Sequence, residues 1–211
     1  MSPCPLCQSL ALSLFHRDRH RSYMRCGHCQ LISVPDEFLL SAADEKAFYD
    51  RHQNNSDDQG YRRFLGRTWQ PLSSRLTPQM QGLDFGCGPG PTISVMAAEQ
   101  GLKMADYDLY YANRPELLEQ QYDFITMTEV IEHVADAFAL LQQLDSLLKP
   151  GAILAVMTKR ALDEQAFINW HYKQDLTHIR FYSIATFEWI AAHFNWQLEV
   201  IDKDVVFFTR A

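Results

Sequence analysis

The stretch LDFGCGPGP, Leu83 to Pro91, places a short apolar run directly before a loop rich in glycine. Gly86, Gly88 and Gly90 let the main chain approach a ligand closely, because glycine has no Cβ and tolerates positive φ. The residues that follow, 92–100, read as a helix whose first turn leaves backbone N–H groups unpaired. The spacing is G-x-G-x-G and not the dinucleotide pattern G-x-G-x-x-G. Ligands of open α/β sheets bind at the carboxyl ends of the strands, so this loop is predicted to cradle a cofactor.

From residue 82 onward, strand and helix patterns alternate. Strands are predicted at 82–86, 102–108, 122–128, 152–158, 196–201 and 205–210, and helices at 92–100, 135–148 and 184–193. This alternation predicts an α/β fold with a Rossmann-like, doubly wound, mostly parallel sheet that carries helices on both faces. Only three residues join the last two strands, so the last strand is antiparallel, because a parallel crossover needs far more chain.

An acidic residue, Asp108, stands at the end of the second predicted strand. It follows the glycine loop at about the distance expected of an acid that binds a ribose. We therefore predict that its carboxylate holds ribose hydroxyls. The alternative is a residue that caps a turn.

Two C-x-x-C pairs stand near the N-terminus: Cys4 with Cys7, and Cys26 with Cys29, eighteen residues further on. This spacing is typical of a ribbon in which four thiolates bind one structural zinc ion. Two disulfides are the alternative, but the N-terminus does not resemble a secretory signal, so a reducing compartment is expected. A zinc-binding ribbon is predicted over residues 1–35.

Between the ribbon and the glycine loop the pattern is helical. Residues 38–52 and 61–72 have apolar residues spaced at three and four, and the polar run 54–60 separates them. We predict a helical linker or lid over residues 36–81, followed by one α/β domain over 82–211.

Composition narrows the class of protein. No apolar run is long enough to span a bilayer, and the chain is expected to be cytoplasmic, with no membrane partner. Residues 82–211 hold nine Lys/Arg against eighteen Asp/Glu. This acidic balance argues against a broad nucleic-acid groove, although it says nothing of the oligomeric state.

The motifs together resemble those of class I S-adenosylmethionine-dependent methyltransferases. The resemblance rests on Asp84 with the glycine loop, on Asp108, on Tyr122-Asp-Phe-Ile, and on Leu148-Lys-Pro-Gly151, and it covers about 82–211. The two cysteine pairs resemble the small zinc-binding domain that precedes some of these enzymes. The family usually has a further strand and two helices after the ribose acid, whereas only the thirteen residues 109–121 stand here. The sheet is therefore expected to be one strand short at that edge.

The resemblance implies a site for S-adenosylmethionine. Asp84 and the loop Gly86–Gly90, which includes Cys87, would lie by the methionine part, and Asp108 would bind the ribose. Thr128 and Glu129 would end the strand beneath the sulfonium. In this family an acidic residue at the end of the missing strand often contacts the adenine, and that residue has no clear counterpart here. Leu109, Tyr110 and Tyr111 would form an apolar adenine wall instead.

The stretch TEVIEHV, 128–134, carries the other cluster of ionisable groups. A similar stretch in quinone-biosynthesis O-methyltransferases, and in enzymes that 2′-O-methylate small RNAs, binds a divalent cation that holds the acceptor oxygens. The matching residues here are Glu129, Glu132, His133 and, further on, His178. Carboxylates with imidazoles suit Mg²⁺, Mn²⁺ or Zn²⁺. The alternative is a metal-free pocket wall, in which Glu129 borders the cofactor and His178 or His133 acts as general base.

The loop 170–183 follows the fourth strand, where the acceptor pocket usually lies. Aromatic residues predict an apolar wall, and polar residues between them predict contacts to the acceptor. The predicted wall is Trp170, Tyr172, Phe181 and Tyr182, and the predicted polar contacts are His171, Asp175 and His178. Trp170 and Phe181 could equally belong to the core.

Two functions of different class follow. The first is an enzyme that methylates an oxygen of a small molecule. The second is a module whose ribbon binds nucleic acid or protein, while the α/β domain senses the cofactor or modifies RNA. The acidic α/β domain and the intact glycine loop favour the first.

Overall fold

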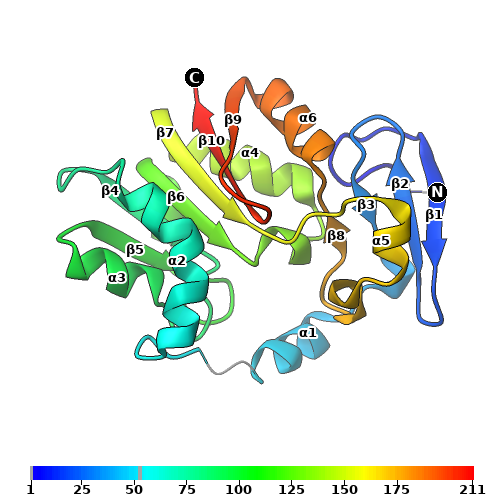
Figure 1. The fold of residues 1–211 in the computed structure, drawn as a ribbon, viewed down its shortest axis with the longest axis horizontal. Coiled ribbons are helices and arrows are strands. Elements are labelled where there is room, and N and C mark those ends of the chain that lie inside the picture. Colours follow the sequence, from blue (N-terminus) through cyan, green and yellow to red (C-terminus); the bar gives the residue numbers. More distant parts are fainter. Residues whose placement is uncertain (1, 52–53) are drawn as a thin grey trace.

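The structure is a computed structural model that describes residues 2–51 and 54–211. Its larger sheet has six strands in the order β5-β4-β6-β7-β10-β9 (Figure 1). The strands are β4 (Gln81–Phe85), β5 (Lys103–Tyr107), β6 (Tyr122–Thr128), β7 (Leu148–Met157), β9 (Trp196–Val200) and β10 (Val205–Arg210). β4 to β7 are parallel, and β10 is antiparallel to both of its neighbours. The predicted mostly parallel sheet and its antiparallel last strand are confirmed.

The sheet ends at β5, as the short 109–121 segment predicted. That segment contains only the 3-10 turn η2 (Pro115–Glu119) and the isolated bridge between Asp108 and Ala112. The chain therefore returns directly to the centre of the sheet at β6.

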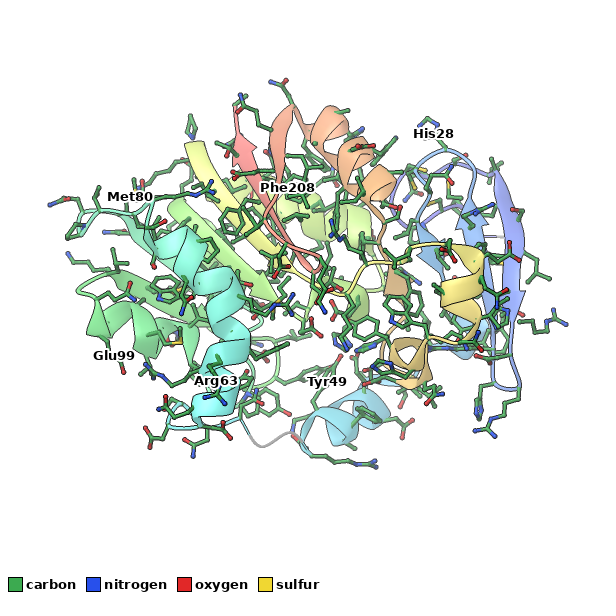
Figure 2. All side chains as sticks on the ribbon, in the orientation of Figure 1. His28, Tyr49, Arg63, Met80, Glu99 and Phe208 are labelled. Carbon is green, nitrogen blue, oxygen red and sulfur yellow. The ribbon has the colours of Figure 1, made fainter. Side chains whose placement is uncertain are left out.

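Helices cover both faces of this sheet. The strands direct alternate side chains to opposite faces. In β7, Leu154 and Val156 pack into the core under α4 (Ala137–Leu147) and α6 (Ile184–Phe194). Ala155 and Met157 pack on the other face, against α2 (Gln59–Ser73) and α3 (Ile93–Glu99). In β10, Phe208, labelled in Figure 2, belongs to the first of these cores.

Two predicted boundaries were wrong. β7 begins at Leu148, so Pro150 and Gly151 lie inside the strand instead of before it. Gly151 adopts φ +76°, and the pairing with β6 shifts near this point, so an irregular start accommodates both residues. The helix predicted over 38–52 is shorter, because α1 covers only Ala42–Tyr49. Ser41 is its N-cap, and the Ser41 side chain accepts a hydrogen bond from Asp44 N. His52 lies outside the described residues.

The N-terminal part forms a second sheet, in the order β1-β2-β3-β8, with every pair antiparallel. Its strands are β1 (Leu12–Arg17), β2 (Ser22–Cys26), β3 (Ile32–Ser33) and β8 (Arg180–Phe181). β8 lies between β7 and α6 in the sequence, so a segment of the α/β part of the chain supplies the last strand of the N-terminal sheet. The domain boundaries at 35 and 81 stay predictions.

Short elements complete the chain. They are the 3-10 turns η1 (Asp36–Phe38), η3 (Ile131–His133) and η4 (His171–Gln174), and the helix α5 (Glu164–Ile168). Across the described residues, no helix combines the length and the apolar character needed to cross a bilayer.

Candidate active site

The glycine loop after β4 folds back on the end of β5. Gly86 and Gly88 adopt φ values of +80° and +68°, which side chains disfavour. The N–H groups of Gly86 and Cys87 donate to the carbonyl of Tyr107, at 2.8 and 3.2 Å. At Gly90 a Cβ atom would stand 2.2 Å from the carbonyl oxygen of Asn54, so only glycine permits this close approach.

Asp108 fixes this loop from the neighbouring strand. Its Oδ2 accepts from Gly88 N at 3.0 Å, and its Oδ1 accepts from the N–H groups of Tyr110 and Tyr111 at 2.8 and 3.1 Å. The carboxylate thus caps a turn and also faces the cavity described below. Its contact with a ribose stays a prediction.

Asp84 is a buried acid beneath the same loop. Its Oδ1 accepts from the Thr126 hydroxyl at 2.6 Å, and no Lys or Arg of the described chain pairs with it. Burial raises the pKa of Asp84 to about 7, while Thr126 lowers it and the nearby Asp106 and Asp108 raise it further. A buried carboxyl without a cation is suited to the positively charged methionine part of S-adenosylmethionine.

Glu129 follows β6 in a strained conformation. Its φ is +54°, uncommon for a residue with a side chain, while its N–H still donates to Met157 O at 2.8 Å. This kink turns the chain at the strand end, where Thr128 and Glu129 both line the cavity. Burial, and then the charge of Glu132, raise the pKa of Glu129 to about 8.

Glu132, His133 and His178 lie together. One ligand atom of each lies within 4.8 Å of those of the other two, and the two imidazole rings are 4.7 Å apart. Glu132 is fully buried: its Oε1 accepts from the Tyr172 hydroxyl, and no residue that the structure describes donates a hydrogen bond to its Oε2. Glu129 lies outside this group but is 3.4 Å from the same Tyr172 hydroxyl, so its part in a cation site stays a prediction.

Backbone carbonyls orient both imidazoles. His133 Nδ1 lies 3.1 Å from Thr177 O, and His178 Nδ1 lies 2.7 Å from Tyr172 O. A carbonyl only accepts, so each Nδ1 carries a proton and the neutral ring keeps its lone pair on Nε2. This arrangement presents two imidazole nitrogens and one buried carboxylate, which is a donor set suited to a divalent cation.

Burial shifts the pKa values of Glu132 and His178 toward their uncharged forms. Burial raises the pKa of Glu132 to about 7, although hydrogen bonds from Tyr172 and a more distant Thr158 hydroxyl lower it. The pKa of His178 is lowered to about 4, mainly by burial and then by the neighbouring His133. His178 is therefore neutral near pH 7, which is the form that binds metal, and it is a weak general base.

A cavity of about 1150 Å³ joins the glycine loop to this cluster. It exceeds the usual volume for one drug-sized ligand and so has room for a cofactor with an acceptor. Its far wall comes from α1, the start of α4 and the loop 175–179. Tyr49, which extends from α1 in Figure 2, brings its ring 5.4 Å from that of His133. The Tyr110 and Tyr111 hydroxyls donate to Glu45 and Asp50, at 2.8 and 2.7 Å, and so hold α1 over the opening.

Charge on the cavity wall is of one sign. Six acidic residues and no lysine or arginine line it among the described residues. The acids are Glu45, Asp84, Asp108, Glu129, Asp136 and Asp175. Such a wall favours a cationic ligand and disfavours an anionic one.

The loop 170–183 contributes less of the cavity than its sequence suggested. Asp175 and His178 line it, but Phe181 is buried in strand β8, and Tyr182 is fully buried against Phe187. Trp170 packs with the ribbon residues around Tyr23. Sequence reasoning missed Tyr61 and Tyr49, both cavity residues, because each reads as one more apolar position of a helix.

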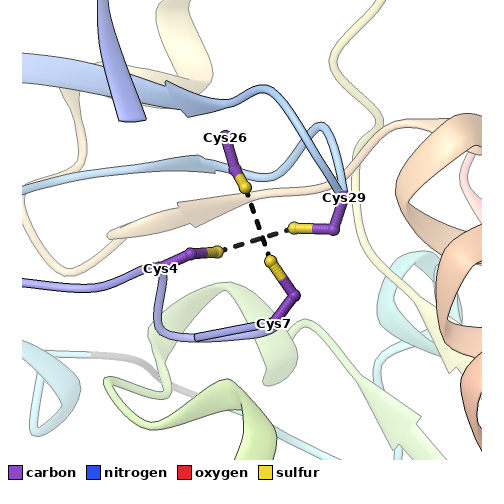
Figure 3. Close-up of side chains that lie close together, drawn as sticks. All are labelled: Cys4, Cys7, Cys26 and Cys29. Carbon is purple, nitrogen blue, oxygen red and sulfur yellow. Dashed lines mark hydrogen bonds between the residues drawn. The ribbon is translucent and has the colours of Figure 1, made fainter. Parts of the chain in front are cut away.

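The four N-terminal cysteines converge on one point (Figure 3). Cys4 and Cys29 have sulfurs 3.5 Å apart, and those of Cys7 and Cys26 are 3.4 Å apart. All four sulfurs lie within 4.8 Å of one another, and the thiols are free, not in disulfides. Four such sulfurs match the donor set of a closed zinc site.

The sheet order, the glycine loop and the acids at the strand ends define a class I methyltransferase fold. Among solved structures, magnesium protoporphyrin IX methyltransferase from Synechocystis, with bound S-adenosylhomocysteine, is similar with a TM-score of 0.53. It is 14% identical and covers 83% of this chain and 97% of its own. Human N-acetylserotonin methyltransferase, in complex with S-adenosylmethionine, has a TM-score of 0.52 at 13% identity, over 81% of this chain and 57% of its own.

The family described as "Methyltransferase domain" matches residues 57–200, and the chain belongs to this family. A ubiquinone biosynthesis O-methyltransferase from Parvibaculum lavamentivorans is 43% identical over 40% of this chain and 43% of that protein. Another of that name, from Yersinia pestis, is 33% identical over 37% of this chain and 32% of its own length. The chain thus spans less than half the length of these relatives.

Replacing Asp108 by Asn tests the cofactor site. The change keeps an oxygen for the turn but removes the charge, so affinity for S-adenosylhomocysteine should fall by roughly 1.5–3 kcal/mol, as for a hydrogen bond to a charged group. Isothermal calorimetry measures it. Asp106→Asn is the matched control, because Asp106 lies two residues before Asp108, in β5, and accepts a hydrogen bond from Ser94. Equal affinities of the wild type and Asp108→Asn would place the ribose elsewhere.

Proposed function

We propose that this chain transfers the methyl group of S-adenosylmethionine to a hydroxyl oxygen of a small, uncharged molecule held on a divalent cation. The observation that carries the proposal is the position of the Glu132, His133 and His178 cluster. Its imidazoles line the same cavity as the glycine loop, so donor and acceptor have one shared space. The relatives named as O-methyltransferases support oxygen as the acceptor atom.

The residues divide the work by position. Asp84, Asp108 and the glycine loop would hold the cofactor, whose methyl group is already activated when it is bound. The cation would lower the pKa of the acceptor hydroxyl. Tyr172 directs the carboxylate of Glu132, and the carbonyls of Tyr172 and Thr177 orient the imidazoles. Most of the acceleration would then come from in-line alignment of donor and acceptor in the cavity, part of whose wall is α1.

The donor set also favours a class of acceptor. Three protein ligands leave about three positions on an octahedral ion such as Mg²⁺. Two neighbouring oxygens of one acceptor can occupy two of these positions, so a vicinal dihydroxy compound is favoured. The acidic wall disfavours phosphorylated acceptors, and it therefore gives less support to the alternative in which the chain modifies RNA.

Methyl transfer should be detectable with labelled S-adenosylmethionine. We expect label on a catechol, much less on the matching monophenol, and none on an RNA oligonucleotide. EDTA should stop the reaction, and Mg²⁺ or Mn²⁺ should restore it. Label on RNA alone, or on the catechol equally with and without EDTA, would contradict the proposal.

Glu132→Gln tests the cation site directly. The amide keeps the shape of the side chain but is a poorer ligand for a hard cation, so Mn²⁺ affinity should fall about 10-fold or more while S-adenosylhomocysteine binding is retained. Electron paramagnetic resonance of free Mn²⁺ measures it. Glu45→Gln is the control, because Glu45 is an acid of α1 that lines the cavity but is not part of the cluster. Wild-type protein that binds no Mn²⁺ would leave the cluster as a metal-free wall.

We further propose that Cys4, Cys7, Cys26 and Cys29 bind one structural zinc ion in a ribbon over residues 1–35. Purified protein should contain one equivalent of zinc by elemental analysis. Cys26→Ser should lose it and unfold at a lower temperature, since zinc binding contributes to folding. Cys87→Ser, which alters the remaining buried thiol, should keep the full equivalent. Less than half an equivalent in the wild type counts against the site.

A further inference from the structure

Arg21 is buried, with 3% of its surface exposed, although it stands in the hairpin turn between β1 and β2. Its guanidinium lies between Tyr23 of β2 and the loop 173–178. Nη2 donates to the carbonyls of Lys173, Asp175 and His178, at 2.8, 2.9 and 2.8 Å. Nη1 donates to Leu176 O at 3.0 Å. Four carbonyls of one six-residue segment therefore converge on a single side chain.

The segment has little regular pairing of its own. It runs from the last two residues of the short turn η4 to just before the two-residue strand β8. Buried carbonyls without donors are costly, so the Arg21 guanidinium supplies the partners that a helix or sheet would otherwise give. No carboxylate pairs with this guanidinium among the described residues, so the carbonyl dipoles and the Tyr23 hydroxyl are its partners.

The segment 173–178 is connected to the imidazole cluster at two residues. His178 is part of it, and Thr177 O is the acceptor that orients His133. Ile179, the next residue, is held on two sides: its N–H donates to Glu132 O, and its carbonyl accepts from Val34 N of the ribbon, each at 2.9 Å. The ribbon thus reaches the cluster through the backbone of 173–179, and none of its described residues, 2–35, lines the cavity.

We propose that Arg21 is a positioning residue of the methyl-acceptor site, through which the ribbon fixes the loop that holds His178 and orients His133. The role needs the planar fork of the guanidinium, because one head group must reach four carbonyls at once. The ribbon is in this respect part of the acceptor site and not a separate recruiting module. The expected effect on Mn²⁺ affinity rests on the proposed function, whereas the expected effect on hydrogen–deuterium exchange of the loop does not.

Three variants test this role. Arg21→Met removes the donors and keeps the length of the side chain, and Arg21→Lys keeps the charge but not the fork. Arg25→Met is the matched control, because Arg25 is an exposed residue of β2, the strand that follows Arg21, and its guanidinium lies over Phe15. For each we measure zinc content, S-adenosylhomocysteine affinity, Mn²⁺ affinity, and hydrogen–deuterium exchange of the peptide that covers 173–179.

In Arg21→Met we expect zinc content and S-adenosylhomocysteine affinity as in the wild type, Mn²⁺ affinity lowered roughly 10-fold or more, as for partners of metal ligands, and faster exchange over 173–179. Arg21→Lys should show the same losses to a smaller degree, and it carries the test should Arg21→Met fail to fold. Arg25→Met should match the wild type throughout.

Wild-type Mn²⁺ affinity and wild-type exchange in both Arg21 variants would overturn the inference. Full restoration of both by Lys would overturn the role of the fork. If the wild type binds no Mn²⁺, the cation proposal fails separately, and exchange alone decides: lost protection in the Arg21 variants supports the anchoring, and retained protection overturns it.

Discussion

The cavity wall that holds the imidazole cluster depends on the pairing of two residues, Arg180 and Phe181, with β3 of the ribbon. Through this short strand the chain leaves the α/β sheet, forms the edge of the ribbon sheet and continues into α6. Arg180 is buried there and donates to Val34 O on the ribbon and to Ala135 O beside the cavity, at 3.0 and 2.7 Å. A buried guanidinium is retained only where its donors are used, so the ribbon and the wall of the cavity are fixed relative to each other.

A second constraint is electrostatic. Glu132 is fully buried beside Glu129, and two carboxylates this close in a poorly solvated place resist ionising together. In the protein alone, the raised pKa values of both acids relieve the repulsion by proton uptake. A bound cation would relieve the repulsion by neutralising both carboxylates. Cation binding would therefore explain why two acids are buried together, although such a pair contributes little to stability by itself.

The sequence predicts the parts of this structure that arise from local patterns. Strand order and direction follow from the alternation of elements and from the three-residue link before β10, and the missing edge strand follows from the shortness of 109–121. β8 could not be predicted, because two residues show no periodicity and their partner lies almost 150 positions earlier. Arg21 carries no motif, since its partners are carbonyls that any residue provides. The left-handed backbone of Glu129 was also hidden, because glycine is the residue that normally marks such a position.

The charge of the cavity connects binding with turnover. S-adenosylmethionine carries a sulfonium, and loss of the methyl group leaves a neutral thioether. Among the described residues the cavity wall has six acids and no lysine or arginine, so it would attract the sulfonium more than the thioether, and poor solvation would strengthen the difference. Burial raises the pKa values of two of these acids, Asp84 and Glu129, to about 7 and about 8, so a positively charged cofactor bound there would draw these two carboxyls into the charged form. In the proposed reaction, conversion to the neutral product would remove that stabilisation, so the acidic wall that favours the cofactor would also favour release of its demethylated form.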